Sequence, residues 1–170
     1  MNKDNIVLIG MPGAGKSTLG VVLAKVLGYQ FIDTDLLIQE SEGRLLKDII
    51  SQDGLETFIK IENHINASIN TKHSVIATGG SVIYGKEAME HLRETGIVIY
   101  LKLSYQTISK RLGNIRQRGV VLKDGQDLYG LYEDRCPLYE KYADIVINCE
   151  DMVLEQTMET IVERINTIVE

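Results

Sequence analysis

Short apolar runs alternate with amphipathic segments along the whole chain. The apolar runs cover residues 5–9, 29–33, 74–77, 97–101 and 144–147, and most of them are rich in Val and Ile. Runs of this length and composition predict buried strands, whereas the segments between them repeat their apolar positions at helical spacing. Strands that alternate with helices predict a parallel sheet with helices on both faces, so the expected fold class is α/β.

The amphipathic segments predict a helix after each strand and further helices between the second and third strands. The last helix places its apolar residues on one face and glutamates on the other. Thr34 is a candidate N-cap for the helix that opens after the second strand. The predicted helices cover residues 19–27, 34 onward, 45–50, 55–69, 86–94, 107–112, 128–142 and the segment from 154 to the end.

The length and net charge of the chain limit the number of domains and the kinds of partner that we expect. A chain of 170 residues predicts a single domain over 1–170. The formal net charge is −6 and there is no long basic run, which argues against non-specific binding of nucleic acid. No apolar run is long enough to span a bilayer and the first strand follows the start at once, so we expect neither membrane association nor a signal peptide. Two cysteines without metal-ligand spacing are typical of a reducing, cytoplasmic setting, and a monomer is expected.

The most specific motif follows the first predicted strand directly. Residues 10–18 read Gly-Met-Pro-Gly-Ala-Gly-Lys-Ser-Thr and match G-x-x-x-x-G-K-[ST], the phosphate-binding loop. In this motif, backbone N–H groups and a helix N-terminus surround the phosphates. Lys16 is placed to reach the β- and γ-phosphates, and the Ser17 hydroxyl to ligate Mg²⁺. The sequence therefore predicts an ATP site; its loop residues are Gly13, Ala14, Gly15, Lys16, Ser17 and Thr18.

Two acids follow the second predicted strand, at the edge of the sheet where ligands bind in this fold class. The third strand ends without an acid, so the Walker B carboxylate that helps to hold Mg²⁺ in many phosphate-loop enzymes is missing. Asp33 is the candidate to support Mg²⁺ beside Ser17. Asp35 is the candidate to orient an acceptor hydroxyl and take its proton. The alternative is that both acids cap or solvate the N-terminus of the next helix. Asp144, which starts its strand, belongs at the opposite end and is interpreted as structural or solvated.

Basic residues gather late in a net-acidic chain. Glycines punctuate residues 113–125, which predicts a lid that closes over ATP and excludes water. Arg118 is the candidate cation for the γ-phosphate, and Arg111 the candidate contact near the nucleotide base. The alternative is a solvated basic loop.

Two further features point to an acceptor site. Arg135 can grip a carboxylate by two parallel hydrogen bonds, or it can pair with Glu133 or Asp134 at the surface. The turn Gly79-Gly80 lets a substrate approach the backbone closely, although an ordinary strand-to-helix turn has the same composition.

In this order the motifs resemble the shikimate kinase family, within the nucleoside-monophosphate-kinase-like phosphate-loop enzymes. The resemblance covers nearly the whole chain and implies a five-stranded parallel sheet in the order 2-3-1-4-5, with ATP-dependent phosphorylation of one ring hydroxyl of shikimate. It rests on residues 10–18, Asp33-Thr34-Asp35, Gly54 with Phe58 and Glu62, Gly79-Gly80, Arg118, and Arg135-Cys136-Pro137-Leu138-Tyr139.

The resemblance also implies residue roles. Asp35 would hold the substrate hydroxyls and act as the base, and Asp33 would support Mg²⁺. Gly79 and Gly80 would line the substrate site, and the helices over about residues 34–70 would also bind the substrate. Arg118 would be the lid cation, and Arg135 would bind the substrate carboxylate.

The sequence departs from the family pattern at three positions. Ile59 stands where the family has a second carboxylate-binding arginine, and Lys60 lies about 100° further round the helix. Gly119 replaces a usual Pro after Arg118, and Ser81 replaces a third Gly. Losing one charged contact costs on the order of 2–5 kcal/mol. An alternative acceptor is therefore another small hydroxylated compound, with less negative charge at Ile59.

A different class of function is a nucleotide-binding regulator that has lost catalysis. Such a protein usually loses the loop lysine or the base, whereas Lys16, Ser17, Asp33 and Asp35 are all present. The sequence therefore favours an enzyme.

Overall fold

The computed structural model describes residues 3–113 and 122–169. Its centre is a five-stranded parallel sheet in the order β2-β3-β1-β4-β5, which confirms the prediction. Central β1 pairs with both β3 and β4, so that Ile6 lies opposite Val75 on one side and Ile97 on the other. The strands are β1 (Asn5–Ile9), β2 (Gln30–Asp33), β3 (Ser74–Ala77), β4 (Gly96–Lys102) and β5 (Ile145–Asn148).

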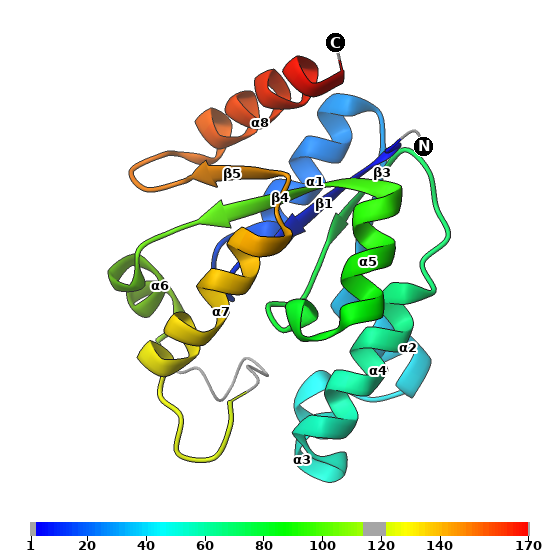
Figure 1. Cartoon of the computed structure of the whole chain (residues 1–170), viewed down its shortest axis with the longest axis vertical. Coiled ribbons are helices and arrows are strands. Elements are labelled where there is room, and N and C mark those ends of the chain that lie inside the picture. Colours follow the sequence, from blue (N-terminus) through cyan, green and yellow to red (C-terminus); the bar gives the residue numbers. More distant parts are fainter. Residues whose placement is uncertain (1–2, 114–121, 170) are drawn as a thin grey trace.

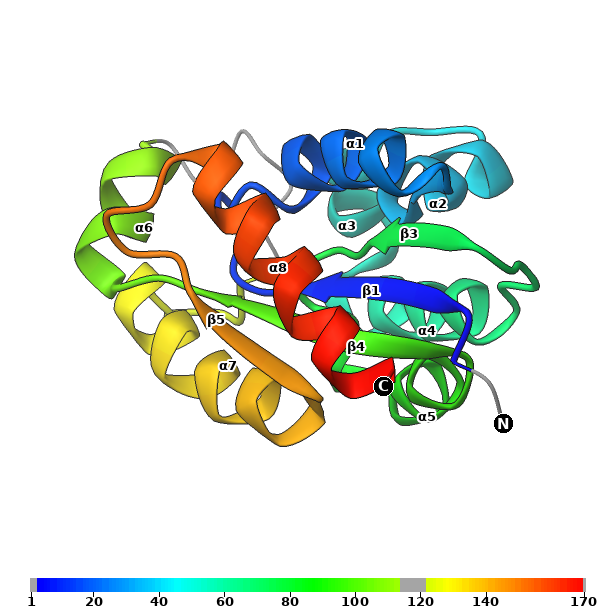
Figure 2. The ribbon, with the colours of Figure 1, turned by 90° about the horizontal axis from the view of Figure 1, so that it is seen from above.

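Helices cover both faces of the sheet (Figures 1 and 2). Helices α1 and α8 lie on one face, and α5 and α7 lie on the other, with α4 packed beside α5. The helices are α1 (Lys16–Leu27), α2 (Thr34–Glu42), α3 (Leu46–Asp53), α4 (Leu55–Ala67), α5 (Lys86–Thr95), α6 (Tyr105–Leu112), α7 (Leu128–Tyr142) and α8 (Leu154–Val169), with a 3₁₀ turn at Val82–Tyr84. Within the two described ranges, none of them has the length and apolar character needed to cross a membrane.

Two hydrophobic clusters stabilise this arrangement. The larger cluster surrounds the sheet, where all five residues of β1 are buried because helices cover both faces. The smaller cluster contains Ile38, Ile49 and Phe58, with Ile59 partly buried against it. It joins α2, α3 and α4 outside the main core, beside the end of the sheet where the strands finish.

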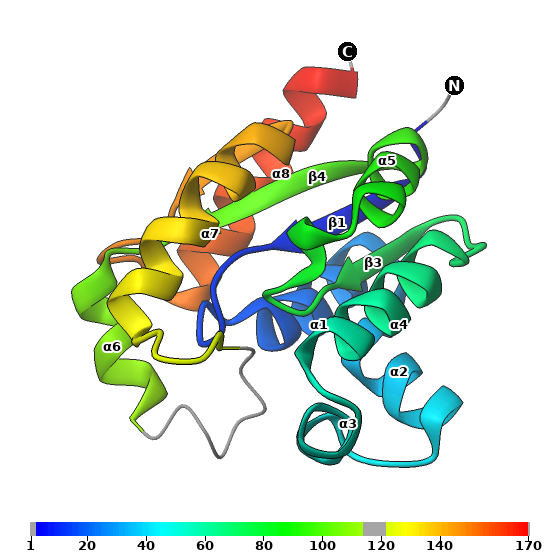
Figure 3. The ribbon, with the colours of Figure 1, turned by 60° about the horizontal axis from the view of Figure 1, so that its bottom comes forward.

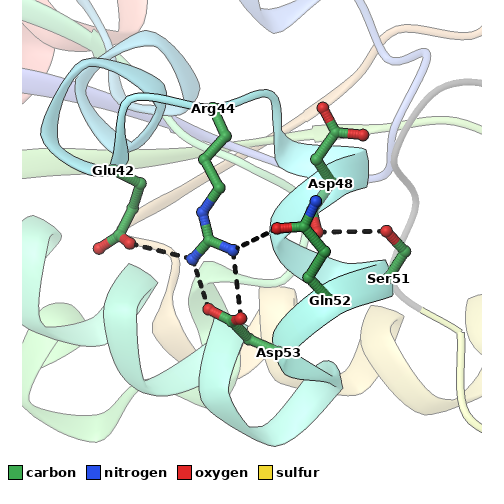
Figure 4. A network of polar contacts seen from close by, with 6 residues as sticks. All are labelled: Glu42, Arg44, Asp48, Ser51, Gln52 and Asp53. Carbon is green, nitrogen blue, oxygen red and sulfur yellow. Dashed lines mark hydrogen bonds and ion pairs between the residues drawn. The ribbon is translucent and has the colours of Figure 1, made fainter.

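A polar network closes the junction between α2 and α3 (Figure 4). The guanidinium of Arg44 pairs with Asp53, donates to the Gln52 side chain at 2.9 Å and lies 3.3 Å from Glu42. The hydrogen bond from Arg44 holds the pKa of Asp53 below its usual range. This network ties the segment before α3 and the end of α2 to the C-terminal end of α3.

The structure differs from the sequence predictions at the starts of two helices and at one short turn. Helix α1 begins at Lys16, three residues early, because Gly15 takes a left-handed conformation (φ 89°) and the chain turns directly from the loop into the helix. Thr34 is not the N-cap of α2: the Asp33 carboxylate accepts the backbone N–H of Asp35 at 3.0 Å instead. The turn at Val82–Tyr84 was not predicted, since three residues carry no periodic signal.

Asp144 has the structural role expected of it. Its carboxylate accepts a hydrogen bond from the backbone N–H of Val98 at 2.9 Å and pairs with Lys3 at 2.8 Å. It therefore links β4 to the start of β5 at the end of the sheet remote from the phosphate loop.

Candidate active site

A cavity of about 290 Å³ lies where the central strands end. Figure 3 shows this end of the sheet between α6 on one side and α3 on the other. One wall is the phosphate loop and the start of α1, a second comes from α2, α3 and α4, and a third from the turn after β3 and from α7. The lining residues are Pro12, Gly13, Gly15, Lys16, Ser17, Thr18, Asp35, Leu46, Phe58, Glu62, Thr78, Gly79, Gly80, Ser81, Leu112 and Arg135.

The phosphate loop has the geometry that its motif predicts. Gly13 (φ 80°) and Gly15 (φ 89°) take left-handed conformations that side chains rarely adopt. The buried Lys16 ammonium donates to the backbone oxygens of Gly10 at 2.7 Å and Met11 at 2.9 Å. Because an ammonium has three protons, one remains for a phosphate oxygen. Burial lowers the pKa of Lys16 to about 8, and the charge of Asp35 opposes this shift.

Ser17 and Asp33 lie together beside the loop. The Ser17 hydroxyl donates to Asp33 Oδ2 at 2.9 Å, while Asp33 Oδ1 caps α2. Asp33 therefore caps a helix, as one interpretation from the sequence expects, and its other oxygen faces the loop serine; its support of Mg²⁺ stays a prediction. One hydroxyl and one carboxylate suit Mg²⁺, which keeps several waters and takes phosphate oxygens as ligands. Across 3–113 and 122–169, no group of three His, Cys, Asp or Glu side chains forms a metal cage.

Asp35 faces the same cavity from the first turn of α2. Burial raises the pKa of its carboxyl to about 6; the nearby Asp33 adds to this effect and Lys16 opposes it. Asp35 Oδ1 lies 2.8 Å from the point that a Cβ at Gly79 would occupy. A side chain at position 79 would therefore collide with Asp35, so the glycine keeps this part of the cavity open.

Glu62 is a site residue to which the sequence reasoning gave no chemical role. Its carboxyl is buried, and Oε1 accepts a hydrogen bond from Ser81 at 2.6 Å. Burial raises its pKa to about 7. The sequence did contain a signal: Glu62 follows Phe58 by four residues, which places a carboxylate on the buried face of α4.

Arg135 is buried in α7, with its guanidinium carbon 5.5 Å from the centre of the Tyr84 ring. Its Nη1 lies 2.8 Å from the point that a Cβ at Gly80 would occupy. Tyr139, one turn further along α7, donates to the backbone oxygen of Gly80 at 2.6 Å. Helix α7 thus brings Arg135 against the glycine turn and into the cavity. Its burial disfavours the alternative of a surface pair with Glu133 or Asp134.

Ile59 and Arg111 are not among the described residues that line this cavity. Ile59 is absent from its lining among the described residues and packs in the smaller cluster, while Lys60 is exposed. Arg111 donates to the backbone oxygen of Gly13 at 3.1 Å and lines a second cavity of about 150 Å³ beside the loop, where a base contact is expected. Arg118 lies outside the described residues, as does most of the predicted lid over 113–125.

Comparison with known proteins gives a consistent result. The family profile described as shikimate kinase matches residues 12–166. A shikimate kinase from Sulfurihydrogenibium sp. (strain YO3AOP1) is 35% identical over 162 residues, which cover 95% of this chain and 97% of that protein. One from Clostridium botulinum (strain 657 / Type Ba4) is 38% identical over 164 residues, covering 94% of each chain.

A solved structure extends the similarity to three dimensions. Shikimate kinase from Acinetobacter baumannii in complex with shikimate superposes with a TM-score of 0.87 at 30% identity, covering 96% of this chain and 93% of that one. Both the sequence and the fold therefore match over nearly the whole length. The chain belongs to the shikimate kinase family of ATP-dependent phosphotransferases.

Proposed function

We propose that this protein transfers the γ-phosphoryl group of ATP to a ring hydroxyl of shikimate, with Mg²⁺ bound to the nucleotide. The observation that carries the proposal is that the phosphate loop and the Asp35 carboxylate line one cavity. A phosphoryl donor held at Lys16 and an acceptor held at Asp35 would face each other there. Family membership supports ATP as donor, and the shikimate complex of the Acinetobacter relative supports shikimate as acceptor.

The donor side of the mechanism follows from the loop. The backbone N–H groups around Gly13 and Gly15, together with the start of α1, would bind the phosphates, and Lys16 would contact the β- and γ-phosphoryl oxygens. Ser17 and Asp33 would hold Mg²⁺, whose charge offsets the negative charge of the transferring phosphoryl group. Arg111 would lie near the base. We assign the lid cation to Arg118 on the strength of the resemblance.

The acceptor side depends on Asp35. With a pKa of about 6, its carboxylate is mostly ionised at neutral pH, so it would accept a hydrogen bond from the acceptor hydroxyl. It would orient that hydroxyl in line with the γ-phosphorus and take its proton as the new P–O bond forms. Gly79 and Gly80 give the acceptor close access to the backbone, and Arg135 would bind its carboxylate. All these groups belong to one chain, so we propose that a monomer is competent and works in the cytoplasm, where ATP is abundant.

A second candidate acceptor is favoured by one observation. Ile59 carries no charge and packs in the smaller cluster, so the described site lacks a second cation for a carboxylate. A small hydroxylated compound with less negative charge would suit this pocket.

A coupled assay of ADP release tests the proposal. The protein is incubated with ATP, Mg²⁺ and a panel that contains shikimate, hydroxy acids, polyols and hydroxylated amino acids. We expect shikimate-dependent turnover in the wild-type protein. Turnover of another acceptor without turnover of shikimate would replace the substrate and keep the reaction class. ATP binding without turnover of any acceptor would indicate a regulator and overturn the proposal.

A further inference from the structure

A carboxylate in the loop between β5 and α8 makes three hydrogen bonds to another element of the fold. Glu150 Oε2 accepts the backbone N–H of Ser104 at 2.9 Å. Its Oε1 accepts the hydroxyl of Ser104 at 3.1 Å and also the hydroxyl of Thr107. The hydrogen bond from the Ser104 backbone is the main cause that holds the pKa of Glu150 below its usual range, so this carboxylate is ionised at neutral pH.

These hydrogen bonds fix the start of α6. Ser104 is the N-cap of this helix, because its hydroxyl oxygen accepts the backbone N–H of Thr107 at 3.2 Å. Glu150 in turn holds the hydroxyl of that cap residue. A negative charge is also favourable at this place, because the helix dipole leaves its N-terminus partly positive. The loop after β5 therefore determines where α6 begins.

The other end of α6 contacts the phosphate loop. Arg111 Nη1 donates to the backbone oxygen of Gly13 at 3.1 Å. Leu112 packs on the same glycine, since a Cβ at Gly13 would lie 3.2 Å from Leu112 Cδ2. Helix α6 has eight residues, which is little more than two turns, so a shift at its start moves its end as well.

The loop that holds α6 also borders the smaller cavity beside the phosphate loop. Cys149, Met152 and Leu154 line this cavity, with Arg111 on another side. Figure 2 shows the loop between β5 and α8 beside α6. A nucleotide that fills this cavity from the phosphate loop would therefore touch both the loop and the helix that Glu150 joins.

We propose that Glu150 is a positioning residue for the nucleotide, which sets the affinity for ATP by holding Arg111 and Leu112 against the phosphate loop. Glu150 is not among the described residues that line either cavity, so it acts through α6 and not by contact with the ligand. The inference rests on the proposed function in one respect, because it takes ATP to bind at the phosphate loop. It holds for any acceptor.

Titration calorimetry with ATP and Mg²⁺, without acceptor, tests the inference on Glu150→Ala. We expect the Kd for ATP to rise about fivefold to thirtyfold, because the start of α6 loses three hydrogen bonds, while the KM for the acceptor stays unchanged. Glu150→Gln should recover most of the affinity, since its amide oxygen accepts the Ser104 N–H and its NH₂ donates to the hydroxyl oxygens. Glu159→Ala is the matched control, because it removes a carboxylate from an exposed position of α8; its Kd should equal that of wild type.

A double-mutant cycle with Arg111→Ala separates positioning from a purely structural role. If Glu150 acts through the end of α6, Glu150→Ala should raise the Kd by a clearly smaller factor in the Arg111→Ala background than in wild type. The same factor in both backgrounds would overturn this route. A Kd for Glu150→Ala within twofold of wild type, even with a lower Tm, would overturn the inference itself. Should Glu150→Ala not fold, Thr107→Val removes one of the three hydrogen bonds and should raise the Kd about threefold; an unchanged Kd would be equally decisive against the inference.

The two proposals fail in different measurements. A wild-type protein that binds ATP but does not phosphorylate shikimate contradicts the proposed substrate, and the comparison of Kd values still decides the role of Glu150. Shikimate turnover together with an unchanged Kd in Glu150→Ala contradicts the inference alone. A wild-type protein that does not bind ATP would overturn both.

Discussion

Replacing Glu62 with Gln should remove a pH dependence of stability that burial of this carboxyl creates. Burial raises the pKa of Glu62 from 4.5 to about 7 in the folded protein. At a pH between these two pKa values, the Glu62 carboxyl is ionised in the unfolded chain but keeps its proton in the folded chain. The folded state then binds more protons, so the contribution of Glu62 to stability falls as the pH rises through this window.

The magnitude follows from the two pKa values. Integrating the linkage relation from pH 5 to pH 8 gives a loss of about 2.5 kcal/mol in the free energy of unfolding. Gln does not titrate, so this loss should be absent from the variant. Asp35 and Lys16 also titrate, but they are present in both proteins and largely cancel in the comparison.

Urea unfolding at pH 5, 6, 7 and 8 measures the effect. We subtract the unfolding free energy of wild type from that of the Glu62→Gln variant at each pH. This difference should increase by about 2.5 kcal/mol from pH 5 to pH 8. Ser81→Ala retains the carboxyl and removes a hydrogen bond that lowers its pKa, so this control should keep the pH dependence. A difference that stays constant from pH 5 to pH 8 would refute the reasoning, because it would mean that Glu62 titrates as it does in the unfolded chain.

Three substitutions and one control variant test the assignments in the active site. Asp35→Asn should lower kcat about 10²- to 10⁴-fold and leave the Kd for ATP, measured by calorimetry, unchanged; a kcat near wild type would contradict its role as base. Ile59→Arg should lower the KM for shikimate tenfold or more if only the second cation is missing, whereas no improvement would mean that the pocket is rebuilt more widely. Gly79→Ala should raise the acceptor KM, since its Cβ would lie under 3 Å from both Glu62 and Asp35. Gly85→Ala is similarly crowded by Asn63 outside the cavity lining, so it should lower the Tm without that rise in KM.

The sheet could be predicted from the sequence because its strands carry a strong local signal. The run 74–77 becomes β3 with the predicted bounds, and 128–142 becomes α7 in the same way. The phosphate loop could also be predicted from a local signal, because its motif lies within nine consecutive residues. Its left-handed glycines and the buried Lys16 confirm the conformation that the motif predicts.

The acceptor site could be predicted only in part because its groups meet through tertiary packing. Nothing near Arg135 in the sequence indicates that it lies against Tyr84, which comes from a 3₁₀ turn that the periodicity did not predict. Glu62 belongs to a helix that was predicted, but its pairing with Ser81 depends on how α4 lies against the turn after β3. Ile59 was assigned to the substrate site by its position in the family pattern, and that assignment stays a prediction; in the structure its side chain is partly buried against the smaller cluster.

That smaller cluster has a consequence for how the protein loses activity. Ile38, Ile49 and Phe58 hold α2, α3 and one face of α4, and the same Phe58 lines the acceptor wall. A cluster with few buried residues opens more readily than a large core. On heating, the groups that face the acceptor should therefore lose their alignment before the sheet melts. Thermal inactivation would then occur at a lower temperature than global unfolding. An acceptor bound in the cavity would bring these two temperatures closer together.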